Sequence, residues 1–170
     1  MKRGFTLIEL LVVISIIGLL SSIVFASLNA ARVKGRNASV LAQVQQIKNA
    51  LFLASTASPT GKFPGVEGSW QCMKSSGTCW LGTYSGNTTL MNALAPYISR
   101  VPSPPNAADS SLHMYDSYLY LPDYNGNIGS SGPGTYIIYA LEGPFNDCQG
   151  YYAGNYGGNL YYCYHLISGL

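Results

Sequence analysis

The longest apolar run in the sequence extends from Phe5 to Phe25, and Glu9 is its single charged residue. Twenty-one residues of α-helix span about 32 Å, which is enough to cross a hydrocarbon core of about 30 Å. An ionisable side chain in hydrocarbon costs several kcal/mol by most estimates and is usually kept for a function. The run therefore predicts a membrane-spanning helix. The function that keeps the carboxylate of Glu9 in this helix requires an explanation.

The helical pattern continues beyond this run. Apolar residues recur at steps of three and four, with glutamines between them, which predicts an amphipathic helix with one stripe on a core. The stripe consists of Val40, Val44, Ile47, Leu51 and Ala54. The first proline is Pro59, and Ser58-Pro59 is a plausible helix stop. We expect one continuous helix from residue 5 to about 55, roughly 75 Å long at the standard rise.

Three later segments are rich in aromatic and β-branched residues and are bounded by Gly, Asn or Pro. They are Tyr118–Leu121, Tyr136–Leu141 and Leu160–Ile167. A short helix is also expected near Thr88–Ile98. The predicted fold class is α+β, in which a long amino-terminal helix packs on a small antiparallel β-sheet.

Charged residues make up only 9% of the chain, well below the roughly 25% of an ordinary soluble domain. Tyrosine (14) and glycine (19) are abundant, which indicates an uncharged polar exterior of the kind common on extracellular surfaces. Lys2 and Arg3 supply the formal net charge of +2. No basic field remains that would favour nucleic acid as a general partner.

The four cysteines are Cys72, Cys79, Cys148 and Cys163. An even number of cysteines, in a chain whose composition is typical of exported proteins, indicates disulfides. Four cysteines allow three pairings. We favour Cys72–Cys79 and Cys148–Cys163 because each pair is close in sequence. The spacing is wrong for zinc, since Cys-x2-Cys is absent and neither histidine is paired with a second ligand.

Lys2-Arg3-Gly4-Phe5-Thr6-Leu7-Ile8-Glu9-Leu10-Leu11 resembles the class III leader of type IV prepilins and type II secretion pseudopilins. The resemblance implies that a membrane prepilin peptidase cuts between Gly4 and Phe5 and N-methylates Phe5. It also implies a pilin-like fold with three parts: a leader (1–4), a transmembrane and filament-core helix (5–28) and a globular head (29–170). The Cys148–Cys163 pair resembles the disulfide-bounded carboxy-terminal loop of many pilins.

This resemblance suggests a task for Glu9. Cleavage would create a cationic α-amine at Phe5, about one helical turn from the Glu9 carboxylate. Opposite charges attract strongly in a low dielectric, and each is costly when left alone. We expect the amine of an incoming subunit to meet Glu9 of its neighbour and to fix the axial register. The alternatives are a cleaved signal peptide, a plain anchor, or a glutamate that reaches the headgroups.

The expected function is structural: a subunit of a type IV pilus-like surface filament, polymerised through the helix Phe5–Leu28. The expected partners are further copies of the chain, prepilin peptidase and the inner-membrane assembly machinery. Before assembly the chain would be a single-pass membrane protein with its amino terminus inside. One alternative is a pseudopilin of a type II secretion-like machine. Another is a minor pilin whose head binds DNA or a glycan, although the basic residues after the helix are too scattered for DNA.

Motifs for catalysis are absent from the sequence, as neither G-x-S-x-G nor H-E-x-x-H occurs. We therefore expect neither an enzyme nor a cofactor. The stretch from Asp123 to Asn127 resembles the opening of a calcium loop. The EF-hand order requires glycine at the sixth place and an acid at the twelfth, where this chain has Ile128 and Gly134. A β-turn at Asn125-Gly126 is expected instead.

Overall fold

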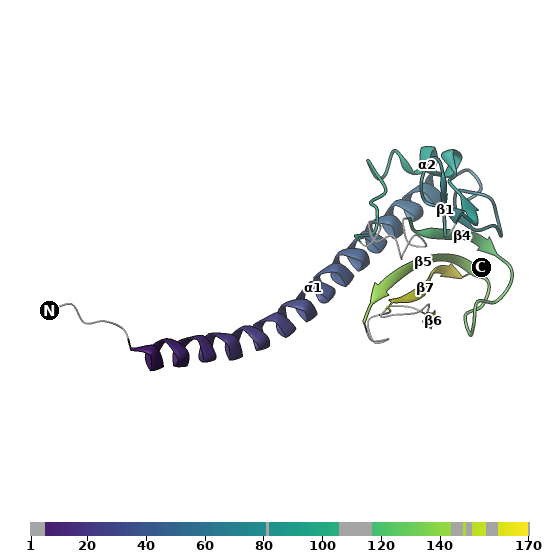
Figure 1. Cartoon of the computed structure of the whole chain (residues 1–170). Helices are drawn as coiled ribbons and strands as arrows, with labels where there is room; N and C mark the ends of the chain where they lie inside the picture. Colours follow the sequence, from purple (N-terminus) through teal and green to yellow (C-terminus); the bar gives the residue numbers. More distant parts are fainter. Residues whose placement is uncertain are drawn as a thin grey trace. The chain divides into compact units, whose positions relative to one another are not determined.

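The computed structural model describes residues 6–80, 82–105, 117–143, 148, 151–155 and 160–169. The chain divides into two compact units, Met1–Gly35 and Arg36–Leu170. Helix α1 (Leu7–Ala57) contributes to both units (Figure 1). It runs through Gly18 without a break and ends directly before Ser58-Pro59, so the prediction of one long helix is confirmed.

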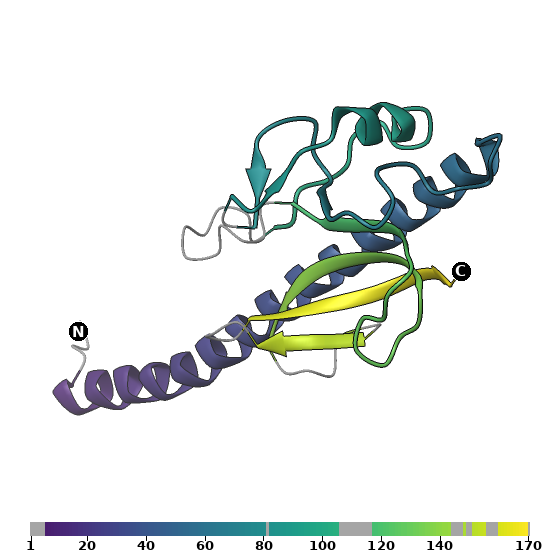
Figure 2. The ribbon, with the colours of Figure 1, turned by 90° about the vertical axis from the view of Figure 1, so that its right-hand side faces the viewer.

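The second unit contains a five-stranded sheet with the order β1-β4-β5-β7-β6, in which every pairing is antiparallel (Figure 2). Its strands are β1 (Gln71–Cys72), β4 (Leu119–Tyr124), β5 (Gly134–Glu142), β6 (Tyr151–Asn155) and β7 (Leu160–Gly169). The three predicted strand segments lie within β4, β5 and β7, which confirms the α+β fold class. The edge strands β1 and β6 were not predicted, and β1 is too short to leave a pattern.

Three smaller elements complete the second unit. Strands β2 (Thr78–Cys79) and β3 (Tyr84–Ser85) form a separate antiparallel pair. Helix α2 (Thr88–Leu94) is shorter than the predicted segment 88–98. The Asn87 side chain caps α2 by accepting a hydrogen bond from the backbone N–H of Leu90 at 3.0 Å.

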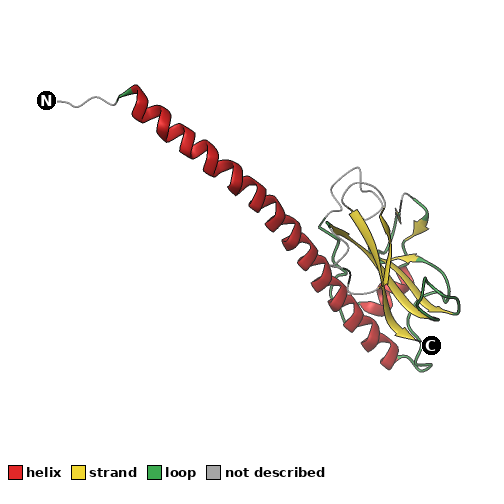
Figure 3. Cartoon of the chain, turned by 90° about the horizontal axis from the view of Figure 1, so that it is seen from below, coloured by secondary structure: helices red, strands yellow, loops and turns green. Residues whose placement is uncertain are grey.

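The core of this unit lies between one face of the sheet and the carboxy-terminal half of α1 (Figure 3). All five residues of the predicted α1 stripe are buried, from Val40 to Ala54. The sheet meets them with alternate residues of its central strands, because successive side chains of a strand point to opposite faces. These residues are Tyr118, Tyr120, Ile137, Tyr139, Leu141, Cys163 and Ile167. Each large apolar side chain buried here contributes roughly 1.5–3 kcal/mol.

Polar contacts fix where α1 meets the sheet. The buried Asn37 side chain donates from Nδ2 to the carbonyl oxygen of Glu142 at 2.6 Å and accepts from its backbone N–H at 2.9 Å. Arg36 forms an ion pair with the Glu142 carboxylate. Further along, the Tyr118 hydroxyl donates to Gln43. Burial raises the pKa of Tyr118, so this hydroxyl stays protonated and keeps its role as a donor.

The turn between β4 and β5 is Gly129-Ser130, not Asn125-Gly126 as predicted. The backbone N–H groups of Ile128 and Ser131 each donate to the other residue's carbonyl oxygen, at 3.2 and 3.0 Å. Gly129 has φ 59°, which suits a tight hairpin. Gly126 has a different use: a Cβ there would lie 2.5 Å from the Tyr124 ring, so glycine lets that ring pack against the backbone.

Asn37→Ala should lower the free energy of unfolding by about 1–3 kcal/mol, because it leaves the two backbone groups of Glu142 without their partner. Urea unfolding of the full chain in micelles, followed by tryptophan fluorescence, measures this change. The matched control is Gln46→Ala, at an exposed position of the same helix, which should stay within about 0.5 kcal/mol. Equal losses in both variants would show that Asn37 does not fix the helix to the sheet.

Candidate assembly site

The first half of α1 exposes apolar side chains on every side. All of its large apolar residues from Leu7 to Leu28 are exposed, between 42% at Leu28 and 75% at Leu7. By length and composition this helix is able to cross a membrane. A helix that is hydrophobic all round, unlike an amphipathic one, needs lipid or other helices as its surroundings.

Three hydroxyl groups of this segment donate within the helix. Ser15, Ser22 and Ser27 each donate to a backbone carbonyl three or four residues earlier, at 2.8–2.9 Å. Such internal bonds remove the need for a polar partner outside the helix. Glu9 is therefore the one charged group that the surroundings of the segment must accommodate.

The Glu9 carboxylate closes the amino-terminal end of α1. Its Oε2 accepts hydrogen bonds from the backbone N–H and the hydroxyl of Thr6, both at 2.8 Å. In return the Thr6 hydroxyl accepts from the backbone N–H of Glu9 at 3.3 Å. This reciprocal pair is a capping box, which satisfies helix donors that have no partner within the helix. Both bonds to the carboxylate use Oε2, so Oε1 is not part of the cap.

The capping role of Thr6 was not predicted in the sequence analysis. The signal was present, because Thr6-Leu7-Ile8-Glu9 fits the Ser/Thr-x-x-Glu pattern that precedes an apolar run in capping boxes. Its presence means that Glu9 has a local structural role beside the predicted role between subunits. The predicted cleavage residues Gly4 and Phe5 lie outside the described residues.

The structure joins the cysteines as Cys72–Cys79 and Cys148–Cys163, with Cα–Cα distances of 6.1 and 5.7 Å. The two bonds support different layers of the second unit. Cys163 belongs to the core that faces α1, whereas Cys72 and Cys79 lie in a smaller cluster with Leu119 and Ile138 on the other face of the sheet. The first bond thus joins β1 to β2, and the second joins β7 to Cys148.

No cluster of three or more His, Cys, Asp and Glu side chains suited to a metal ion occurs within the described ranges. Asp123, the first residue of the stretch that resembles a calcium loop, is joined to β5 instead. Its backbone N–H donates to the Thr135 hydroxyl at 3.1 Å, and that hydroxyl donates to the Asp123 carboxylate at 3.2 Å.

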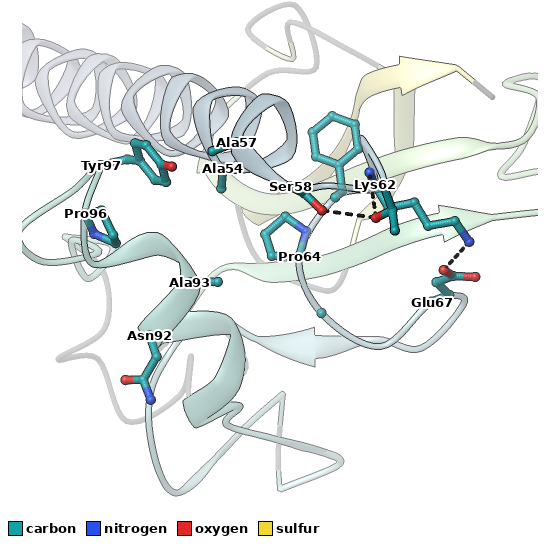
Figure 4. Close-up of a pocket in the computed structure, with 13 residues that line it drawn as sticks. Ala54, Ala57, Ser58, Lys62, Pro64, Glu67, Asn92, Ala93, Pro96 and Tyr97 are labelled. Carbon is teal, nitrogen blue, oxygen red and sulfur yellow. Dashed lines mark hydrogen bonds and ion pairs between the residues drawn. The ribbon is translucent and has the colours of Figure 1, made fainter.

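A groove of about 650 Å³ lies between the end of α1, the loop that follows it and α2 (Figure 4). Lys62 and Glu67 form an ion pair of 2.5 Å at its side. The hydrogen bond to Glu67 raises the pKa of Lys62, so the amine stays charged and paired. Ser58, Asn92 and Tyr97 also line the groove, but this set provides no nucleophile beside a base and no pair of acids.

Comparison with known proteins gives one match. Residues 1–25 match the family described as the prokaryotic N-terminal methylation motif. No curated protein and no solved structure matches the chain. The matched segment covers the residues before α1, the Thr6–Glu9 cap and the apolar run up to Phe25. This motif, together with the long amino-terminal helix and small antiparallel sheet, supports a likeness to type IV pilin-like proteins.

Proposed function

We propose that the chain is the structural subunit of a type IV pilus-like surface filament, polymerised through residues 5–28 after prepilin peptidase removes residues 1–4. The observation that carries this proposal is the helix that is apolar on every side and has one carboxylate at its start. Residues 29–170 would form the head of each subunit. The role is structural, and no cofactor is required for it.

The apolar helix suits two environments in succession. Lipid tails and the apolar sides of other helices are similarly apolar surroundings. Moving the helix from one to the other therefore changes the free energy of its apolar surface little. Before assembly the helix would cross the membrane with its amino terminus inside. The assembly machinery of the inner membrane would then transfer it into a bundle of identical helices.

Glu9 would provide register within this apolar bundle. Apolar contacts between uniform helices specify axial position poorly, whereas a buried charge requires its partner at one place. The cap formed with Thr6 occupies Oε2 and holds the carboxylate at the end of the helix. Oε1 would then accept the methylated amine of Phe5 from the next subunit, so one carboxylate would serve both contacts.

A pseudopilin of a type II secretion-like machine is the second candidate, because it would share the leader and the apolar helix. The low content of charged residues in this chain favours an external filament, whereas its two disulfides suit both candidates because the periplasm is oxidising too. Long surface filaments made of this chain would support a pilus, and short periplasmic ones would support a pseudopilus.

The chain recovered from cells should begin at Phe5 and carry one methyl group on its α-amine. Intact-mass and amino-terminal fragment spectra measure both changes. Replacing Gly4 by leucine alters the predicted cleavage site, so the recovered chain should keep its leader and not begin at Phe5. The matched control is Gly18→Ala, which should be processed normally because a Cβ at Gly18 meets nothing within 4 Å. A start near Ser27 or Ala31 would contradict the proposal.

Glu9→Gln should abolish filaments while leaving the helix cap intact, because glutamine serves in a capping box but carries no charge. Thr6→Ala removes the cap, worth about 1 kcal/mol, and keeps the charge, so filaments should still form. Sheared filament yield and electron microscopy measure assembly, with membrane-inserted subunit quantified alongside. If Thr6→Ala stops assembly and Glu9→Gln does not, the carboxylate acts as a cap alone.

A further inference from the structure

The sheet face that points away from α1 has its own cluster of side chains. Cys72, Cys79, Leu119 and Ile138 are buried in it, and five partly buried aromatic residues pack around them. These are Trp70, Trp80, Tyr84, Tyr162 and Tyr164. The cluster explains part of the tyrosine excess in the sequence, and it is separate from the helix that assembles the filament.

Four of these rings form a continuous row. The ring centroids of Trp80 and Tyr162 are 5.7 Å apart, those of Tyr162 and Tyr164 are 6.0 Å apart, and those of Tyr164 and Trp70 are 5.9 Å apart. All three distances lie in the range of favourable aromatic pairs. The two tyrosines come from β7, while the two tryptophans come from the segment that contains β1 and β2.

The Cys72–Cys79 disulfide positions both tryptophans. Trp70 is two residues before Cys72, and Trp80 directly follows Cys79, so closing this loop places the two indoles over the same face of the sheet. Trp80 has φ 54°, which is rare for a bulky residue and persists only where the surroundings impose it.

A cavity of about 610 Å³ opens beside the Trp70 end of the row, a size typical of ligand pockets. Trp70 and Tyr164 line it together with Tyr124, Asn127 and Leu121. Asn127 is exposed, and the Tyr124 ring lies so close to Gly126 that a Cβ there would be 2.5 Å from it. Burial, with the neighbouring phenols of Tyr162 and Tyr84, raises the pKa of Tyr164, so its hydroxyl remains a donor.

The chemistry of this lining selects one class of ligand. None of the described residues that line the cavity carries a charge, so an ionic ligand would find no partner there. Aromatic faces attract the weakly positive C–H face of a pyranose ring, and the amide and phenol groups match its hydroxyls. We propose that this cavity binds a neutral saccharide, with its sugar ring against Trp70 and Tyr164 and its hydroxyls directed to Asn127 and Tyr124.

The proposal does not rest on filament assembly, because every residue of the cavity belongs to the second unit. The test of filament assembly and the test of sugar binding are therefore independent, because a chain that fails to polymerise would still bind the sugar. The two tryptophans of the chain both lie in the ring row, so their fluorescence reports on this surface alone.

The experiment uses the full chain with Trp80→Phe, which leaves Trp70 as the only indole, in micelles of lauryldimethylamine oxide, whose headgroup is not a sugar. Galactose, N-acetylglucosamine, lactose and chitobiose are titrated up to tens of millimolar. At least one should change the Trp70 emission in a saturable way. Adding Asn127→Ala, at an exposed position that the fold does not need, should weaken that binding at least threefold. Tyr164→Ala should weaken it at least tenfold.

Four results would contradict the proposal. The first is the absence of a saturable change with all four sugars. The second is a response that Asn127→Ala and Tyr164→Ala both leave unchanged. The third is a Trp70 emission that responds to protein concentration and not to sugar, which would make this surface a contact between copies of the chain. Binding of N-acetylneuraminic acid as tightly as the neutral sugars would contradict the uncharged specificity.

Discussion

The amino-terminal half of α1 is apolar on every side, and no part of a water-exposed protein can satisfy such a surface by itself. Lipid is one suitable environment, and a bundle of identical helices is another. The rest of the molecule follows from this constraint. In the proposed filament, a polar group specifies the position of this helix among equivalent helices, and the head folds without using the apolar half.

Glu9 shows how one side chain can meet two requirements. A carboxylate at the third position of a helix satisfies donors that would otherwise be unpaired, which stabilises the end of the helix in any environment. The same carboxylate in hydrocarbon demands a positive partner. The capping role is visible within the subunit, in the bonds from Thr6. The role between subunits is proposed, and it uses the oxygen that the cap does not occupy.

The second unit is organised by the two faces of its sheet. The face toward α1 forms the main core, and Asn37 connects the helix to the end of β5 through the backbone of Glu142. The opposite face has a smaller cluster, in which aromatic rings from β7 pack with rings from the segment that contains the Cys72–Cys79 disulfide.

The sequence by itself determined α1, its apolar half, the buried stripe from Val40 to Ala54 and the three central strands. Periodicity encodes these features locally, because each side chain's environment follows from its place in a helix or strand. Only the tertiary structure decided the rest. The turn at Gly129-Ser130 depends on how β4 and β5 pair, and Gly126 instead leaves room for the Tyr124 ring. The aromatic row joins Trp70 and Trp80 to tyrosines more than eighty residues later, and no local pattern relates residues at that separation.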